Sequence, residues 1–164
     1  MDDGNTRIQQ ELELLRRNFP NLDYLAEGHW VRLPRYGFPR GIWDQDMVDV
    51  CFQIPERIPG QAPYGFYVRP GLTLCNKQAV ADYAFPAPTG FGDDWGKFSW
   101  QLEGWAPVAD LVAGTNMVNF ARSFFDRLAQ GLRHDIDIFS CRSLRQLLST
   151  PRERSRIGRF HARR

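Results

Sequence analysis

In residues 47–55, MVDVCFQIP, every second residue from Val48 to Ile54 is a large apolar residue, and the residues between them are Asp, Cys and Gln. One face of the segment carries the side chains of Val48, Val50, Phe52 and Ile54, and the other those of Asp49, Cys51 and Gln53. Because successive side chains of a strand point to opposite faces of a sheet, the pattern predicts a strand with one buried face. Cys51 is then expected on the less buried side, as a structural thiol.

Two helical patterns flank this strand in the sequence. Residues 6–18 place Ile8, Leu12 and Leu15 at spacings of four and three, with no Gly or Pro between them. Residues 111–132, starting near Asp110, carry an apolar stripe at similar spacings, with Phe124 beside it, made of Val118, Ala121, Phe125, Leu128 and Leu132. This stripe predicts a helix packed on a sheet. A last short helix is expected at 142–148.

The remaining segments predict further strands and one long loop. Strands are expected at 30–33 and 64–68, and residues 98–105 are expected to form a short strand or a turn. Residues 77–97 are rich in proline and glycine and are expected to form a long irregular loop, which in a compact domain is usually functional. Successive strands without helical crossovers predict an α+β fold: an N-terminal helix, a four-stranded antiparallel meander, the long loop and a C-terminal helix.

Size and composition favour one globular domain. The chain has 164 residues, of which 43% are hydrophobic, enough for a sizeable core. No apolar run reaches the roughly 18 residues that span a bilayer, and the polar, acidic N-terminus is not expected to be a signal peptide. Three cysteines at irregular spacing do not predict a disulfide framework. We therefore expect a cytoplasmic protein with reduced thiols and no membrane partner.

Positive charge is concentrated at the C-terminus. Residues 142–164 hold eight arginines against one acid, Glu153, which leaves a formal charge of −5 for residues 1–141 out of the total of +2. We accordingly divide the chain into a domain at 1–133 and a basic, Arg-rich extension at 134–164. Such an extension can contact an acidic partner or nucleic acid, or it can be a solvated terminus.

Two further groups of residues point to weaker hypotheses. His134, Asp135 and Asp137 are of metal-ligand type, but no second cluster converges on them, so a solvated turn is preferred and no metal is predicted. Aromatic residues of the 77–100 region could form a docking surface or cap the core: Phe91, Trp95, Phe98 and Trp100. No phosphate loop, dinucleotide fingerprint or zinc spacing is present, and no cofactor is expected.

Three segments together resemble a known family. They are HWVRLPRYGFPRGIW at 29–43, VDVCFQIPERIPGQAPYGFYVRPGL at 48–72 and FSWQLEGWAPVADL at 98–111. Their order and spacing resemble the ubiquitin-conjugating-enzyme fold, and more closely its prokaryotic family E, which is encoded near ubiquitin-like and multi-ubiquitin proteins. The resemblance covers about residues 8–132. It implies an activating, adenylating enzyme and a ubiquitin-like protein as partners.

The resemblance also implies where a site would lie. In conjugating enzymes a His-Pro-Asn triplet follows the third strand of the meander, and its asparagine stabilises the oxyanion. Residues 74–76, Leu-Cys-Asn, occupy that place, so Asn76 matches the asparagine and Cys75 matches the proline. The catalytic cysteine is expected several residues further on, yet no cysteine follows before Cys141.

A second departure concerns the segment before Trp-x-Pro. Members of family E tend to carry a histidine there, and this chain has Gln101, which cannot titrate near neutral pH. Trp105, Pro107 and Asp110 fit the family pattern. Ser99 lies near the point where the nucleophile loop rejoins the fold; a serine would form an ester instead of a thioester and would need an activating base.

These residues lead to two main hypotheses within one pathway. The first is a silent, ubiquitin-conjugating-enzyme-like component that binds the modifier or its activating enzyme. The second is an enzyme that carries the modifier on Cys75 or Ser99. The missing nucleophile favours the silent component, in which Asn76 matters more than Cys75. A weaker alternative is a nucleic-acid-binding protein that acts through the Arg-rich extension. Each residue also has a purely structural interpretation: a turn for Asn76, a small half-buried thiol for Cys75 and a surface hydroxyl for Ser99.

Overall fold

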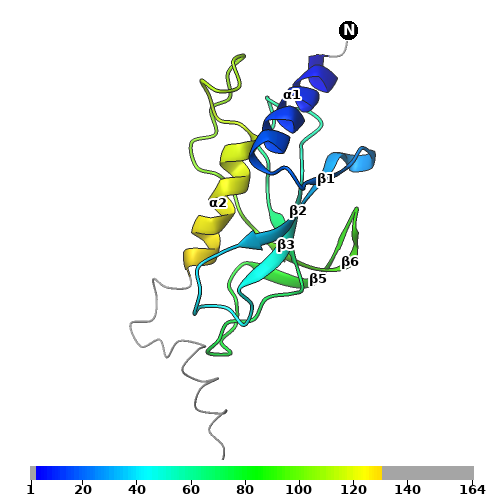
Figure 1. Cartoon of the computed structure of the whole chain (residues 1–164). Helices are drawn as coiled ribbons and strands as arrows, with labels where there is room; N and C mark the ends of the chain where they lie inside the picture. The colour runs from blue at the N-terminus through cyan, green and yellow to red at the C-terminus, as the bar shows by residue number, and fades with distance from the viewer. Residues whose placement is uncertain (1–2, 131–164) are drawn as a thin grey trace, which may run out of the picture.

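The computed structural model describes residues 3–130, and their side chains from Thr6 onward (Figure 1). Within this range the chain forms two α-helices, six strands and a short 3₁₀ turn. In chain order these are α1 (Asp3–Asn18), β1 (Asp23–Leu25), η1 (Glu27–His29), β2 (Trp30–Gly37), β3 (Met47–Gln53), β4 (Phe66–Arg69), β5 (Tyr83–Thr89), β6 (Gly92–Phe98) and α2 (Met117–Ala129).

The strands form one antiparallel sheet with the order β1-β2-β3-β4-β6-β5. The α+β class and the antiparallel sheet are therefore as predicted. Strands β1 to β4 follow one another in sequence and in space, but the sheet has six strands instead of the four expected. The two additional strands on the far side of β4 belong to the β5–β6 hairpin.

The hairpin overturns the prediction of a long irregular loop at 77–97. Pro86 and Pro88 favoured a loop because proline cannot donate to a strand ladder. In the structure both lie on β5, the outermost strand, whose pairing with β6 is interrupted on either side of Ala87. Edge strands with such irregularities are the positions where a sheet tolerates proline. A two-residue turn, Gly90-Phe91, joins the strands.

Strand β3 confirms the period-two pattern. Val48, Val50 and Phe52 are buried on the face that meets the helices, and Ile54 is buried just beyond the strand. Cys51 lies on the opposite face of β3, as predicted. The sequence predicted that this face is the less buried one, but at Cys51 it is covered. The side chain is fully buried, and desolvation raises its pKa to about 12. Cys51 is thus an inert structural thiol.

The cover over Cys51 comes from the β5–β6 hairpin. Its turn lies against β2, where a side chain at Gly90 would overlap the ring of Trp30. Trp95 on β6 is fully buried, and the Arg69 guanidinium lies 4.6 Å from the centre of its ring. The hairpin therefore curls over the outer face of the sheet and encloses a second, smaller group of buried side chains.

The other strands differ from the prediction mainly at their ends. Strand β2 extends to Gly37 through Pro34, with a bulge between Leu33 and Tyr36. Strand β4 starts at Phe66, so Tyr64 precedes it and is 61% exposed. The short β1 was not predicted. Of the two alternatives for residues 98–105, the turn is the one observed: β6 ends at Phe98, and a turn lies at 103–104.

Both helices pack on the inner face of the sheet and contact each other (Figure 1). Helix α1 buries Ile8, Leu12 and Leu15, as its spacing predicted. The core between the layers is aromatic: the rings of Phe66 and Phe124 are stacked with their centres 4.3 Å apart. Stacked and edge-to-face rings in this range contribute beyond their buried area.

Helix α2 begins at Met117, six residues later than the start of the predicted segment 111–132. Asn116 precedes it in an extended conformation and accepts a hydrogen bond from the backbone N–H of Asn119, whose side chain bonds back to Asn116. This reciprocal capping box defines the start of the helix. The stripe is also corrected: Phe124 is buried and Phe125 is 46% exposed.

Several predictions lie outside the described residues. They concern Leu132, the cluster of His134, Asp135 and Asp137, the helix at 142–148 and the basic extension. In the part of the chain that the structure describes, neither helix has the length and apolar character needed to cross a membrane.

Candidate functional site

The turn at 74–77 holds two of the predicted site residues. Leu74 forms an isolated bridge with Trp43, and the backbone N–H of Cys75 donates to the Ile42 carbonyl at 2.9 Å. The N–H of Lys77 donates to the Leu74 carbonyl at 2.9 Å and closes the turn. The segment after β4 is therefore fixed against the segment that precedes β3.

Asn76 is an exposed residue of this turn. Its Oδ1 accepts a hydrogen bond from the backbone N–H of Gln78 at 3.0 Å. This contact is an Asx turn, the structural role expected of an asparagine after a strand. An oxyanion would need the side-chain N–H groups, which this contact does not use. The role of Asn76 as an oxyanion donor stays a prediction.

Cys75 is partly buried, and its Sγ lies 3.1 Å from the Trp43 carbonyl oxygen. Among the described residues, Cys51 is a free, buried thiol, in line with the expectation of reduced thiols. Only a thiolate attacks an acyl group efficiently. That Cys75 is not the nucleophile stays a prediction.

Ser99 and Asp110 lie in other loops. Ser99 is exposed directly after β6, and its N–H donates to the Asp82 carbonyl at 2.9 Å. Asp110 is exposed in the segment before α2, where its Oδ1 accepts from the N–H of Val112 at 3.0 Å. The Ser99 contact continues the pairing of β5 with β6, and the Asp110 contact is local to its loop. Within residues 3–130, these contacts include no histidine that could activate the Ser99 hydroxyl.

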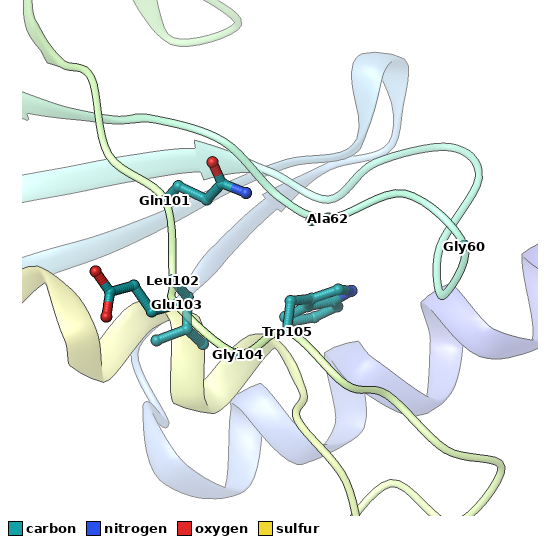
Figure 2. A pocket seen from close by; sticks show the side chains of 7 residues that line it. All are labelled: Gly60, Ala62, Gln101, Leu102, Glu103, Gly104 and Trp105. Atoms are coloured by element: carbon teal, nitrogen blue, oxygen red, sulfur yellow. The ribbon is translucent and has the colours of Figure 1, made fainter.

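Gln101 lines an open groove of about 680 Å³ (Figure 2). One wall is the run from Gln101 to Trp105, and the other is the β3–β4 loop at Gly60 and Ala62. Figure 2 shows the side chains of Gln101 and Trp105 on the side of their segment that faces this loop, with Glu103 directed away. We call this depression the Trp105 groove.

Direct contacts hold the two walls of the Trp105 groove together. The indole Nε1–H of Trp105 donates to the Pro59 carbonyl at 3.4 Å. At the base of the loop, the N–H of Gly65 donates to the Trp100 carbonyl at 2.8 Å. Ile58 is buried and anchors the β3–β4 loop to the core. The groove is thus a preformed feature of two tethered loops.

A buried ion pair anchors the segment that continues from the groove into α2. Arg7 and Glu11 on α1 are both buried, with Nε and Oε1 3.1 Å apart. Arg7 Nη1 donates to the Val108 carbonyl at 2.7 Å, and Glu11 Oε2 accepts from the N–H of Met117 at 2.8 Å. Burial raises the pKa of Glu11, against the opposing effects of the Met117 hydrogen bond and the Arg7 charge.

This anchor was missed from the sequence, although a signal was present. Arg7 and Glu11 are four residues apart on α1 and adjacent to the buried positions Ile8 and Leu12. An i,i+4 pair of opposite charges is usually read as a surface feature. Its position beside the apolar stripe was the hint that this pair is buried.

The four aromatic residues of the 77–100 region divide between the two faces of the sheet. Phe98 is fully buried in the core, and the indole N–H of Trp100 donates to Ser123 Oγ on α2 at 2.9 Å. Trp95 is fully buried under the β5–β6 hairpin on the outer face, and Phe91 packs near it with ring centres 6.4 Å apart. Capping the core is therefore observed for Phe98 and Trp100.

The chemistry of the Trp105 groove suits binding. Its polar groups are an amide, a carboxylate, an indole N–H and backbone groups. In the described residues, no three His, Cys, Asp or Glu side chains gather in a way that could hold a metal ion. Apart from the Glu103 carboxylate, which is directed away from the β3–β4 loop, the seven residues that line the groove offer no side chain that commonly acts as a nucleophile or a base.

Comparison of the chain with family models, with curated proteins and with solved structures finds no match. Membership of family E therefore stays an expectation from the three sequence segments.

Proposed function

We propose that this protein is a docking component of a prokaryotic ubiquitin-like modification pathway, built on a ubiquitin-conjugating-enzyme-like domain of family E. In this proposal it binds an activating, adenylating enzyme or its ubiquitin-like protein through the Trp105 groove. It does not carry the modifier covalently.

The order of elements is the observation that supports the pathway most strongly. A helix precedes four consecutive antiparallel strands, β1 to β4, and a turn with Asn76 follows the third predicted strand of the meander, β4. Trp105 and Pro107 then precede α2. This succession is similar to the one that the resemblance implies, except that the turn follows the fourth strand of the run and not the third. The β5–β6 hairpin is an addition to it, placed where the resemblance implies an active-site loop.

The state of the described cysteines supports a silent role. Cys51 is buried with its pKa raised to about 12, so its thiolate is strongly disfavoured. Cys75 is partly buried, and its Sγ lies 3.1 Å from the Trp43 carbonyl oxygen. A thioester carrier needs an accessible thiolate. Binding, in contrast, needs only the preformed groove and its hydrogen-bonding groups.

The test mixes the full chain with the activating enzyme and ubiquitin-like protein of the same genome and with ATP. Adducts are read on denaturing gels, with and without a thiol reductant or hydroxylamine. We expect no adduct on this chain, together with its retention on the immobilised activating enzyme or ubiquitin-like protein. Retention without an adduct separates docking from catalysis.

Two results would contradict the silent role. A reductant-sensitive adduct that disappears in Cys75→Ala would establish a thioester carrier. An adduct that resists reductant, is cleaved by hydroxylamine and is lost in Ser99→Ala would establish an ester carrier. Absence of both adduct and retention would contradict membership of the pathway.

A further inference from the structure

A second depression, of about 380 Å³, lies on a different part of the surface from the Trp105 groove. It is bounded by the end of α1, by β2 and by α2. We call it the Phe125 groove. The side chains that give the groove its aromatic, apolar and charged groups are those of Phe19, Pro34, Arg35, Tyr36, Arg122 and Phe125.

The floor of the Phe125 groove is apolar and partly open to solvent. Phe125 is 46% exposed, although its neighbour Phe124 is fully buried. Phe19 is only partly buried, where the chain leaves α1. Exposing a large aromatic side chain forgoes the free energy that its burial would contribute. An apolar side chain of a binding partner would recover part of it.

The walls of the Phe125 groove are preformed. The Tyr36 hydroxyl donates to the Ala121 carbonyl at 2.8 Å and ties β2 to α2. Burial raises the pKa of Tyr36 to about 12, so this hydroxyl keeps its proton at physiological pH. Arg122 Nη2 donates to Asn18 Oδ1 at 2.6 Å and ties α2 to α1. A partner would therefore meet a largely pre-organised surface, which reduces the entropic cost of binding.

The charges around the Phe125 groove are mainly positive. The charged residues that line it are Arg35 and Arg122. Among the residues that line the groove there is no acid.

Two acids lie near the groove without balancing these arginines. Asp49 faces the bulge of β2, but its Oδ2 is paired with Arg32 at 2.7 Å and its Oδ1 accepts from the N–H of Arg35. Asp126 follows Phe125 on α2 and is close enough to act electrostatically on Tyr36. One nearby carboxylate, that of Asp126, remains against the two arginines that line the groove, so the groove favours an acidic ligand.

We propose that the Phe125 groove binds an acidic peptide segment of a partner protein. One aromatic or aliphatic side chain of the segment packs on Phe125 and Phe19, and flanking carboxylates pair with Arg35 and Arg122. This inference does not depend on the proposed function, because it uses none of the residues of the Trp105 groove.

The test uses the full chain and a fluorescein-labelled peptide in which one Phe is flanked on each side by three Glu residues. Binding is measured by fluorescence anisotropy. We expect Arg35→Glu and Phe125→Ser each to weaken binding by about tenfold or more, and rising salt to weaken it further. Arg40→Glu reverses an exposed arginine outside the groove and should change the affinity by less than about twofold. Thermal melts check that each variant folds.

Crosslinking distinguishes this groove from the Arg-rich extension, which could also attract an acidic peptide. The Phe of the probe is replaced by benzoylphenylalanine, and photo-crosslinks are mapped by mass spectrometry. Crosslinks within 34–37 or 122–125 support the proposal. Crosslinks only within 142–164, or equal losses in Arg40→Glu and Arg35→Glu, would overturn it. A dimer of this chain that depends on Phe125 would overturn the assignment to a peptide.

Discussion

Removing the carboxylate of Glu11 should destabilise the fold far more than its position on a helix suggests. Glu11 is fully buried and makes two contacts, with Arg7 Nε at 3.1 Å and with the N–H of Met117 at 2.8 Å. In Glu11→Ala the Arg7 guanidinium stays buried without its counter-ion. Its Nη2 already lacks a hydrogen-bond partner among the described residues.

The magnitude follows from this arrangement. Breaking a buried ion pair from one side costs about 3–5 kcal/mol, because a charge is left uncompensated. Loss of the bond to Met117 also leaves an N–H of the first turn of α2 unsatisfied. Against a total stability of about 5–15 kcal/mol for a domain, this change removes a large share. The melting temperature should fall by roughly 10 °C or more.

Denaturant titration followed by circular dichroism measures this change, with Glu13→Ala as the matched control. Glu13 lies on the same helix and is exposed, so its substitution should alter the free energy of unfolding by less than about 0.5 kcal/mol. If Glu11→Ala cost less than about 1 kcal/mol, or no more than the control, the pair would not anchor the 105–117 segment and the reasoning would be refuted.

Four further predictions concern the core, the cap, the buried thiol and pH. Phe124→Ala should cost about 3–5 kcal/mol in denaturant titration, whereas Phe125→Ala should cost less than about 1 kcal/mol; equal costs would contradict the observed burial. Asn116→Ala should lower stability by about 1 kcal/mol through loss of the cap, and an unchanged unfolding midpoint would argue against the capping box. Cys51 should react with a maleimide only after denaturation, and labelling of the native protein would show that its cover opens. The pKa of Glu11 is raised above 4.5 in the folded state, so the folded protein binds this proton more tightly than the unfolded chain does. The unfolding free energy of the wild type should therefore fall as pH rises from about 4.5 through the raised pKa. Glu11→Gln should reduce this dependence of the unfolding free energy on pH.

Local sequence patterns predicted the helices and strands in which the spacing of apolar residues within one short segment identifies the element. The alternation at 47–55 predicts β3, and the spacing of Ile8, Leu12 and Leu15 predicts α1, because one buried face decides each pattern. The hairpin at 83–98 could not be predicted in this way. Its prolines are tolerated only because β5 is an edge strand, and a strand's place in a sheet depends on pairings far away in sequence.

The start of α2 and the candidate site show the same limit. Asn116 could have been recognised as a cap, but the apolar stripe was extended towards Asp110 instead. Gln101 was named from the resemblance, whereas its partners in the groove, Gly60 and Ala62, lie about forty residues earlier in the chain. Only the folded loops bring them together. The burial of Arg7 and Glu11 likewise depends on the position of α2, which no local pattern contains.

A calorimetric titration of the activating enzyme with this protein tests docking through the Trp105 groove most directly. The decisive variant is Ala62→Trp, which places a large ring in the groove, and its matched control is Ala26→Trp at an exposed position outside it. We predict that wild type and the control bind equally and that Ala62→Trp binds at least about tenfold more weakly while melting at a similar temperature. Equal binding by all three proteins, or no binding by the wild type to either the enzyme or the ubiquitin-like protein, would contradict the account.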